Sequence, residues 1–124
     1  MEQYFEDINK VNNVAKILKI ISDPTRLKIL FSLLNEDKCT CECGCHDCES
    51  CQCLSCMITK CVSEIVEDVQ ESQSLVSHQL KVLRKANLVA VEKQGKHVYY
   101  RLSDHHVKLL LNVALEHVEE NENV

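Results

Sequence analysis

Hydrophobic residues recur at helical spacing in the first third of the chain. Over residues 7–22 they fall every three or four positions, which predicts an amphipathic helix. Its apolar residues are Ile8, Val11, Val14, Leu18 and Ile21. A second helix is predicted from Pro24 to about Asn35, because Asp23 suits an N-cap and proline suits the first helical position. We expect this helix to bury Leu27, Leu30, Phe31 and Leu34.

A cysteine-rich segment at about 38–61 interrupts this pattern, and helical spacing then returns. A short third helix is predicted from near Val62. Its inward-facing residues are Ile65, Val66 and Val69. Ser72 suits the N-cap of a fourth helix over 73–86. The core stripe of that helix is Val76, Leu80 and Leu83. We expect Asn87 to end it, because asparagine tolerates the left-handed conformation that is common after helix ends.

Apolar and polar residues alternate between Leu88 and Leu102, on either side of a turn at 93–96, which predicts a β-hairpin. A last helix is predicted over 104–120. Its expected buried residues are Val107, Leu110, Leu111, Ala114 and Val118. This order of elements is typical of a winged helix-turn-helix, a mainly α fold with a β-hairpin wing. We predict one such domain over 1–124, with 38–61 as an insertion.

Composition narrows the class of protein. The 124 residues include two glycines, one proline and no tryptophan, so we expect a helical chain whose small core a homodimer would extend. No stretch approaches the roughly 18 apolar residues of a membrane span, and the acidic N-terminus lacks a signal core. A cytoplasmic protein is therefore expected. In that reducing compartment, nine cysteines indicate metal ligands rather than disulfides.

Charge is unevenly distributed along the chain. The formal net charge is −5, yet residues 73–101 contain six cations and one acid, a local +5, which leaves −10 for the rest. A basic segment on an acidic body is typical of DNA-binding proteins. Charge alone is equally compatible with a solvated surface on which cations happen to cluster.

Three motifs resemble those of one family of regulators. Residues 21–30, ISDPTRLKIL, resemble the second-helix signature of the ArsR/SmtB metal-sensing repressors. Residues 72–84, SQSLVSHQLKVLR, resemble their recognition helix, and residues 95–102, GKHVYYRL, resemble their wing. The resemblance covers nearly the whole chain except the insertion. Three residues depart from the pattern: Asn87 replaces a usual glycine, Gln79 a frequent histidine, and Glu71 a usual apolar residue.

The resemblance implies a homodimeric repressor whose apo form binds double-stranded operator DNA and whose affinity metal weakens. Two recognition helices related by a dyad would read half-sites about 34–36 Å apart. The expected phosphate contacts are Lys81, Arg84, Lys93, Lys96 and Arg101. The expected base or backbone readers are Gln73, Ser74, Ser77 and His78. Taken singly, each of these residues is equally compatible with a solvated surface position.

The resemblance also implies a zinc site on the last helix. The residues that match the spacing of the family's ligands are Asp104, His106, His117 and Glu120. His106 and His117 lie close to three helical turns apart, about 16 Å along the axis. Because zinc–nitrogen bonds are about 2 Å long, one helix cannot place both imidazoles on one ion. An antiparallel partner helix would bring the first pair of ligands to the second pair of the other subunit.

This set of nitrogen and carboxylate ligands suits Zn²⁺, Co²⁺ or Cd²⁺ better than soft Cu(I). Nearby residues that could substitute are His105, Glu116 and Glu119. The alternative is a polar helix start followed by ordinary surface histidine and glutamate residues, without a metal.

The cysteine-rich segment is the second candidate metal site. Its thiols are Cys39, Cys41, Cys43, Cys45, Cys48, Cys51, Cys53, Cys56 and Cys61, with His46 among them. C-x-C and C-x-x-C spacings let two sulfurs converge on one soft ion at about 2.3 Å, which favours Cd²⁺, Cu⁺, Zn²⁺ or As(III). The composition resembles metallothionein. Cys61 stands where relatives carry the first cysteine of a sensing motif, whereas Ser63 replaces the second.

Three interpretations of this segment stay open: a second sensing site, a metal-capturing appendage, or a thiol redox or persulfide sensor. The whole chain shows no nucleophile–base arrangement, glycine-rich loop or cofactor motif, so we do not expect an enzyme. We predict a metal-responsive transcriptional repressor of metal efflux or sequestration genes. The alternatives are a metal-buffering protein or a thiol-redox-sensing protein on the same scaffold, and the basic segment speaks against a buffer.

Overall fold

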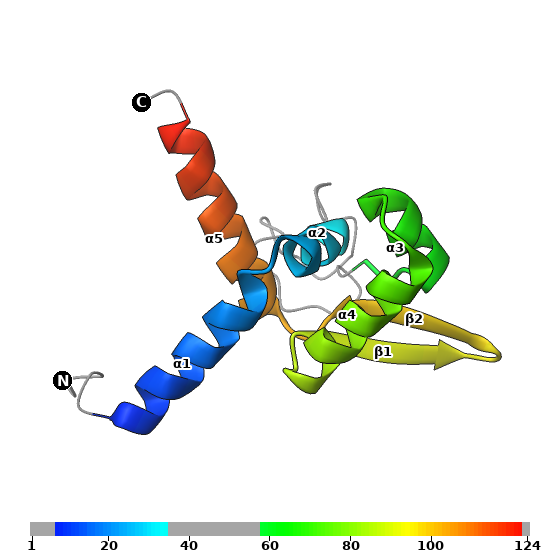
Figure 1. The fold of residues 1–124 in the computed structure, drawn as a ribbon, viewed down its shortest axis with the longest axis horizontal. Helices are drawn as coiled ribbons and strands as arrows, with labels where there is room; N and C mark the ends of the chain where they lie inside the picture. The colour runs from blue at the N-terminus through cyan, green and yellow to red at the C-terminus, as the bar shows by residue number, and fades with distance from the viewer. Residues whose placement is uncertain (1–6, 35–57, 123–124) are drawn as a thin grey trace, which may run out of the picture.

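A computed structural model describes residues 7–34 and 58–122 of the chain. Five helices and a two-stranded hairpin follow one another in the predicted order. They are α1 (Ile8–Ile21), α2 (Pro24–Ser32), α3 (Val62–Val69), α4 (Gln73–Lys85), β1 (Val89–Gln94), β2 (His97–Leu102) and α5 (His105–Asn121). In Figure 1, α1 and α5 project as two diverging arms, and the hairpin points away from them beneath α4. The winged helix-turn-helix prediction is confirmed.

Local sequence signals fix the helix ends. Asp23 caps α2 by accepting a hydrogen bond from the Arg26 backbone N–H at 3.0 Å, and Ser72 caps α4 in the same way from Leu75 at 3.2 Å. Pro24 opens α2, where its missing N–H costs nothing. Asn87 adopts a left-handed φ of 59° after α4. These predictions are confirmed.

The core lies where α2, α3 and α4 pack together over the base of the hairpin. Its buried apolar residues are Ile29, Leu30, Leu33, Leu34, Ile65, Val69, Val76, Leu80, Leu83, Leu88, Val89, Leu102, Val107 and Leu111. Two predicted core residues of α2, Leu27 and Phe31, are only partly buried. Ile29 is fully buried instead, because α2 packs against both α3 and α4 rather than against one neighbour.

The hairpin is anchored at its base and exposed at its tip. β1 and β2 pair antiparallel from Val89 opposite Leu102 to Gln94 opposite His97, and Gly95 supplies the left-handed turn residue with a φ of 63°. Val89 and Leu102 are buried, whereas residues 93–97 are exposed. Lys60, just before α3, adds an isolated bridge to Tyr100 of β2. The wing is therefore fastened to the helix-turn-helix.

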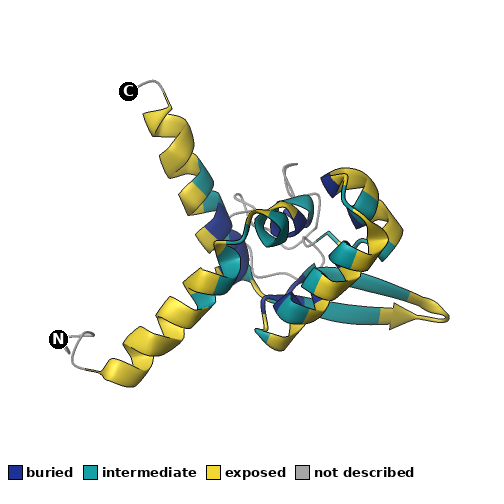
Figure 2. Ribbon diagram, in the orientation of Figure 1, coloured by how far each residue is buried: buried dark blue, intermediate teal, exposed yellow. Residues whose placement is uncertain are grey.

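The apolar residues of α5 are a correction to the sequence analysis, and α1 exposes an apolar stripe as well. Leu110 and Val118 of α5, expected in the core, are 41% and 55% exposed, and Ala114 is exposed as well. On α1 the exposed apolar residues are Ile8, Val11, Val14 and Leu18. The reason is that both arms leave the core, so that only Ile17, Ile20 and Ile21 of α1 pack against it. Figure 2 shows both arms as largely exposed ribbons.

Within residues 7–34 and 58–122, no helix has the length and apolarity needed to cross a bilayer.

Candidate nucleic-acid interface and metal ligands

The helix α4 separates a buried apolar stripe from an exposed polar face. Val76, Leu80 and Leu83 are buried, which fixes the side of the helix that faces the core. The remaining surface of the helix exposes all six of its candidate DNA contacts. They are Gln73, Ser74, Ser77, His78, Lys81 and Arg84. The side chains that sequence analysis assigned to DNA thus share one accessible surface.

The wing contributes two exposed lysines and one guanidinium that is already engaged. Lys93 lies near the end of β1 and Lys96 lies in the turn, and both are exposed. Arg101 differs, because its Nε donates to Glu92 Oε1 at 3.0 Å and its Nη1 donates to the Leu102 and Ser103 carbonyls at 3.0 and 3.2 Å. Only 16% of the Arg101 side chain is exposed. The Arg101 guanidinium, which was predicted to contact a DNA phosphate, is therefore held within the wing by these hydrogen bonds.

This ion pair leaves the local charge unchanged. Arg101 and Glu92 cancel each other, so the net +5 of residues 73–101 rests on five exposed cations. They are Lys81, Arg84, Lys85, Lys93 and Lys96. An accessible +5 surface over α4 and the wing is the electrostatic arrangement that phosphate groups require.

Two of the predicted α5 ligands lie together at the start of the helix. Asp104 is the N-cap, and its Oδ1 accepts from the Val107 backbone N–H at 3.1 Å. The His106 Nδ1 lies 3.9 Å from the same oxygen, and the His105 ring contacts the His106 ring at a tilt of 38°, with centroids 4.0 Å apart. Both Asp104 and His106 are exposed.

The other two predicted ligands, His117 and Glu120, are exposed in the last turns of α5. At 1.5 Å per residue, His117 lies about 16 Å along the axis from His106. The part of the chain that the structure describes brings no three histidine, cysteine or acidic side chains close enough to hold one ion. The four predicted ligands therefore lie as two pairs near opposite ends of one helix.

Cys61 is the one member of the cysteine set within the described residues. It is the N-cap of α3, and its backbone N–H donates to Glu64 Oε1 at 3.3 Å. Its thiol lies 3.1 Å from Ser63 Oγ and 3.2 Å from Glu64 Oε1, and the residue is partly exposed. The candidate ligands Cys39 to Cys56 and His46 lie outside the described residues.

A contact between α2 and α4 was not predicted from the sequence. The Arg26 Nε donates to Gln79 Oε1 at 2.7 Å, and both residues are partly buried. The partners are 53 positions apart, so no local spacing indicates the pair. The only signal was indirect: Gln79 is one of the three departures from the family's pattern.

Comparison with known proteins identifies the relatives of this chain. Residues 59–91 match the family described as "Bacterial regulatory protein, arsR family". The "Cadmium resistance transcriptional regulatory protein CadC homolog" of Staphylococcus aureus is 32% identical over 93% of this chain and 79% of its own length. The "Transcriptional repressor SmtB homolog" of Synechocystis sp. is 26% identical over 93% of this chain and 70% of its own length.

Solved structures share the fold. A homodimeric winged helix-turn-helix DNA-binding domain from Mycobacterium bovis, Mb0332, has a TM-score of 0.66 and covers 98% of this chain and 92% of its own, at 18% identity. Proteins of this type are transcriptional regulators, not enzymes, and winged helix-turn-helix regulators bind DNA. The extent and identity of the match to the staphylococcal protein, together with the match over the helix-turn-helix, show that this chain belongs to the arsR family of bacterial regulatory proteins.

Proposed function

We propose that the protein is a cytoplasmic homodimeric repressor that binds operator DNA without metal and releases it when metal binds at α5. The genes it controls encode metal efflux or sequestration. The observation that carries this proposal is the division of the predicted ligands between the two ends of one exposed helix. Such a division gives a complete site only when two subunits meet, so metal acts on their relative orientation.

Dimerisation is supported by the apolar residues that the arms leave exposed. Val113, Val118 and Leu110 of α5 are 61%, 55% and 41% exposed, and α1 exposes a stripe of its own. Burying one such side chain gains about 1.5–3 kcal/mol, and contiguous apolar surface on a small protein marks an interface. A second copy of the chain, pairing α1 and α5 of each subunit, would cover both stripes.

DNA binding is supported by the exposed polar and cationic side chains of α4 and the wing. A dyad would present two copies of α4 to successive major grooves about 34–36 Å apart. Lys81, Arg84, Lys93 and Lys96 then contact phosphates, while the first turns of α4 read bases or backbone through Gln73, Ser74, Ser77 and His78. We leave Arg101 out of this set because Glu92 already holds its guanidinium.

Metal binding at α5 combines Asp104 and His106 of one subunit with His117 and Glu120 of its partner. Two imidazole nitrogens and two carboxylate oxygens form a tetrahedral set that suits Zn²⁺, Co²⁺ or Cd²⁺. Asp104 follows β2 by two residues, so a shift at the metal acts directly on the end of the wing. Couplings of about 5–150-fold in affinity are typical of such linked sites.

The cysteines form a second proposed site, for Cd²⁺, Cu⁺, Zn²⁺ or As(III). Cys61 supports a regulatory role because it begins α3, the first helix of the helix-turn-helix. The alternatives are a metal-capturing appendage and a thiol-redox sensor, which the same measurements separate.

The test is the affinity for the DNA upstream of the protein's own gene, titrated with Zn²⁺, Cd²⁺ and Cu⁺. Four proteins are compared: wild type, His106→Ala with His117→Ala, a deletion of 39–56, and Glu122→Gln as an exposed control at the end of α5. We expect Zn²⁺ to weaken binding of the wild type and the control but not of the double variant.

A wild type that binds metal yet keeps its DNA affinity would be a buffer rather than a metal-responsive repressor. Release by peroxide in the presence of a chelator would instead indicate a thiol sensor. A wild type that shows no preference for its own upstream DNA over random DNA would contradict the repressor itself.

A further inference from the structure

Arg26 lies at the junction of three helices. From the first turn of α2, its Nη1 donates to the Ile20 carbonyl of α1 at 3.2 Å, while its Nε donates to Gln79 Oε1 of α4 at 2.7 Å. The backbone of the same residue is fixed by Asp23, whose carboxylate caps α2. One side chain therefore links the end of an arm, the start of α2 and the recognition helix.

The contact with Ile20 has a clear physical reason. Ile20 is in the last turn of α1, where backbone carbonyls have no partner within the helix. A cation at the C-terminal end of a helix also interacts favourably with the helix dipole. A guanidinium has a planar fork of donors, so it can satisfy this carbonyl and still donate to Gln79. A lysine, with its compact ammonium, does not match both directions.

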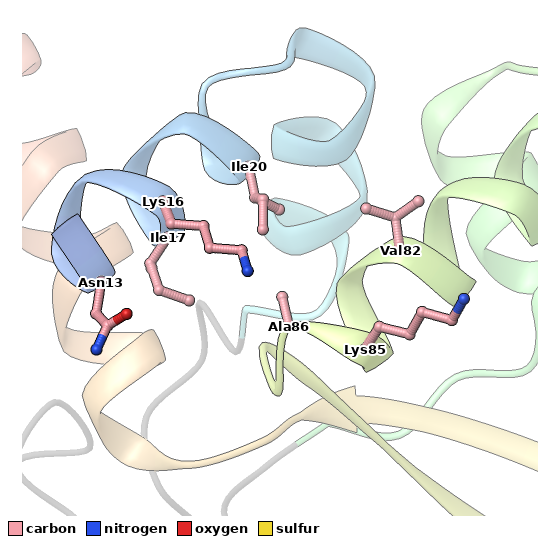
Figure 3. Close-up of a pocket in the computed structure, with 7 residues that line it drawn as sticks. All are labelled: Asn13, Lys16, Ile17, Ile20, Val82, Lys85 and Ala86. Atoms are coloured by element: carbon pink, nitrogen blue, oxygen red, sulfur yellow. The ribbon is translucent and has the colours of Figure 1, made fainter. Parts of the chain in front are cut away.

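Next to the Arg26–Gln79 hydrogen bond, α1 and α4 do not pack directly against each other along their whole length. A pocket of about 430 Å³ separates them, lined by Asn13, Lys16, Ile17, Ile20, Val82, Lys85 and Ala86. Figure 3 shows Ile17 and Ile20 of α1 facing Val82 and Ala86 across this space. Because side chains do not fill the pocket, apolar contact alone fixes the relative position of the two helices poorly there. The Arg26–Gln79 hydrogen bond supplies a directional constraint.

Gln79 is well placed to control the rotation of α4. It follows Ser77 and His78 on the exposed face and precedes the buried Leu80. Each residue turns the helix by about 100°, so holding Gln79 toward α2 sets the direction in which Ser77 and His78 point. A small rotation would displace these side chains from the groove without unfolding anything.

A second α2 cation gives a useful comparison. Lys28 Nζ lies 3.7 Å from Glu71 Oε1, in the turn before α4, with side chains 56% and 33% exposed. Glu71 is, like Gln79, a departure from the family's pattern, so both unusual polar residues pair with α2. The Lys28 pair is long and solvent-screened, so it constrains the helix far less than the short, partly buried hydrogen bond.

We propose that Arg26 is a positioning residue, which orients the recognition helix through Gln79 and makes that orientation depend on the end of α1. This proposal rests on the proposed repressor function, because it concerns the DNA-reading face of α4 and an arm that pairs with a second subunit. The guanidinium does not contact DNA in this role.

The test measures binding to the DNA upstream of the protein's own gene and to a random duplex of equal length, over a range of salt concentrations. The variants are Arg26→Met, Gln79→Leu, both together, and Lys28→Gln as the matched control. Thermal unfolding of each variant gives the folded fraction, by which the affinities are corrected. Gln79→Leu is informative because it removes the acceptor without removing a charge.

We expect Arg26→Met and Gln79→Leu each to weaken specific binding about tenfold or more, because the hydrogen bond that orients α4 is lost in both subunits of the dimer. Binding to random DNA and the salt slope should stay as in the wild type. The double variant should bind its specific DNA no more weakly than the single variant with the lower affinity, because both substitutions break the same hydrogen bond between Arg26 and Gln79. Lys28→Gln should remain within about twofold of the wild type.

Three results would overturn the proposal while leaving the repressor function intact. They are specific binding by both variants that equals the wild type, additive losses in the double variant, and a salt slope reduced in Arg26→Met. In a dimer, loss of a phosphate contact would reduce that slope by about 1.8. Failure of the wild type itself to prefer its own upstream DNA would instead overturn the proposed function, and this proposal with it.

Discussion

Lys60 and Tyr100 exchange two backbone hydrogen bonds, of 2.9 Å from Lys60 N to Tyr100 O and 2.7 Å in the reverse direction. They join the residue before Cys61 to the middle of β2. The wing and the start of α3 therefore form one unit, although 40 positions separate the two residues in sequence. The Lys60 side chain adds an ion pair with Asp68 of α3.

This bridge gives a prediction about stability. Lys60→Pro removes the backbone donor, so the free energy of unfolding should fall by about 1–3 kcal/mol. Lys60→Gln keeps both backbone bonds and loses only a surface ion pair, which is worth at most about 1 kcal/mol. Chemical denaturation of both variants checks the difference. Equal losses would show that the side chain, not the backbone bridge, fastens the wing.

The exposed stripes give a prediction about assembly. Leu18→Glu on α1 and Val113→Glu on α5 should each produce monomers, because a carboxylate in a covered apolar interface is strongly disfavoured. We expect the dimer dissociation constant to rise about 100-fold or more. Sedimentation equilibrium measures this, with Asn9→Glu as the control, because the exposed Asn9 precedes Leu18 by nine residues and so lies about half a turn away from it on α1. Unchanged dimers in both stripe variants would exclude these arms as the interface.

The divided α5 ligands predict complementation between subunits. One chain carries Asp104→Asn and His106→Ala, and the other carries His117→Ala and Glu120→Gln. Neither homodimer should bind Zn²⁺ at α5. After mixing and reassociation, each heterodimer regains one intact site, so binding should approach about a quarter of an ion per chain. All chains also carry the deletion of 39–56, so that the cysteine segment does not bind Zn²⁺. Calorimetry measures the Zn²⁺ bound per chain.

A mixture that binds no more Zn²⁺ than its two parents would mean that the ligands do not combine across the dimer. Zn²⁺ binding by either parent alone would point to other ligands, such as His105, Glu116 or Glu119.

The two kinds of wing cation predict different salt behaviour. Lys96→Gln should reduce the salt slope of DNA binding by about 1.8 per dimer, since each subunit loses one phosphate contact. Arg101→Gln should leave the slope unchanged and lower the free energy of unfolding instead, because it breaks a charge-assisted link inside the wing. A reduced salt slope of DNA binding in Arg101→Gln would show that Arg101 contacts a phosphate after all.

Local signals predicted the fold well. Caps at Asp23 and Ser72, the left-handed Asn87 and the alternation of the hairpin each involve residues close in sequence, so their physics is readable from a short window. The exposure of Leu110 and Val118 was not readable in this way. An apolar stripe shows that a surface will be covered, but its period is the same whether the cover is the chain's own core or a second subunit.

Side-chain partners distant in sequence were also beyond prediction. Arg101 looked like a free cation because Glu92 lies across the hairpin, and the register that makes them diagonal neighbours depends on the folded turn. Arg26 and Gln79 meet only when α2 and α4 pack. The separation of His106 from His117 along α5 was predictable, because the rise per residue of a helix alone sets it.

The cap at the start of α5 has a consequence for sensitivity. Asp104 Oδ1 is held by the backbone of Val107, so this carboxylate is ordered before any cation arrives. A metal ion that binds this carboxylate does not have to order it. The loss of side-chain entropy on binding is therefore smaller than for a ligand that is free to rotate. In the proposed repressor, the N-cap residue Asp104 would thus also help to set the metal concentration at which gene expression begins.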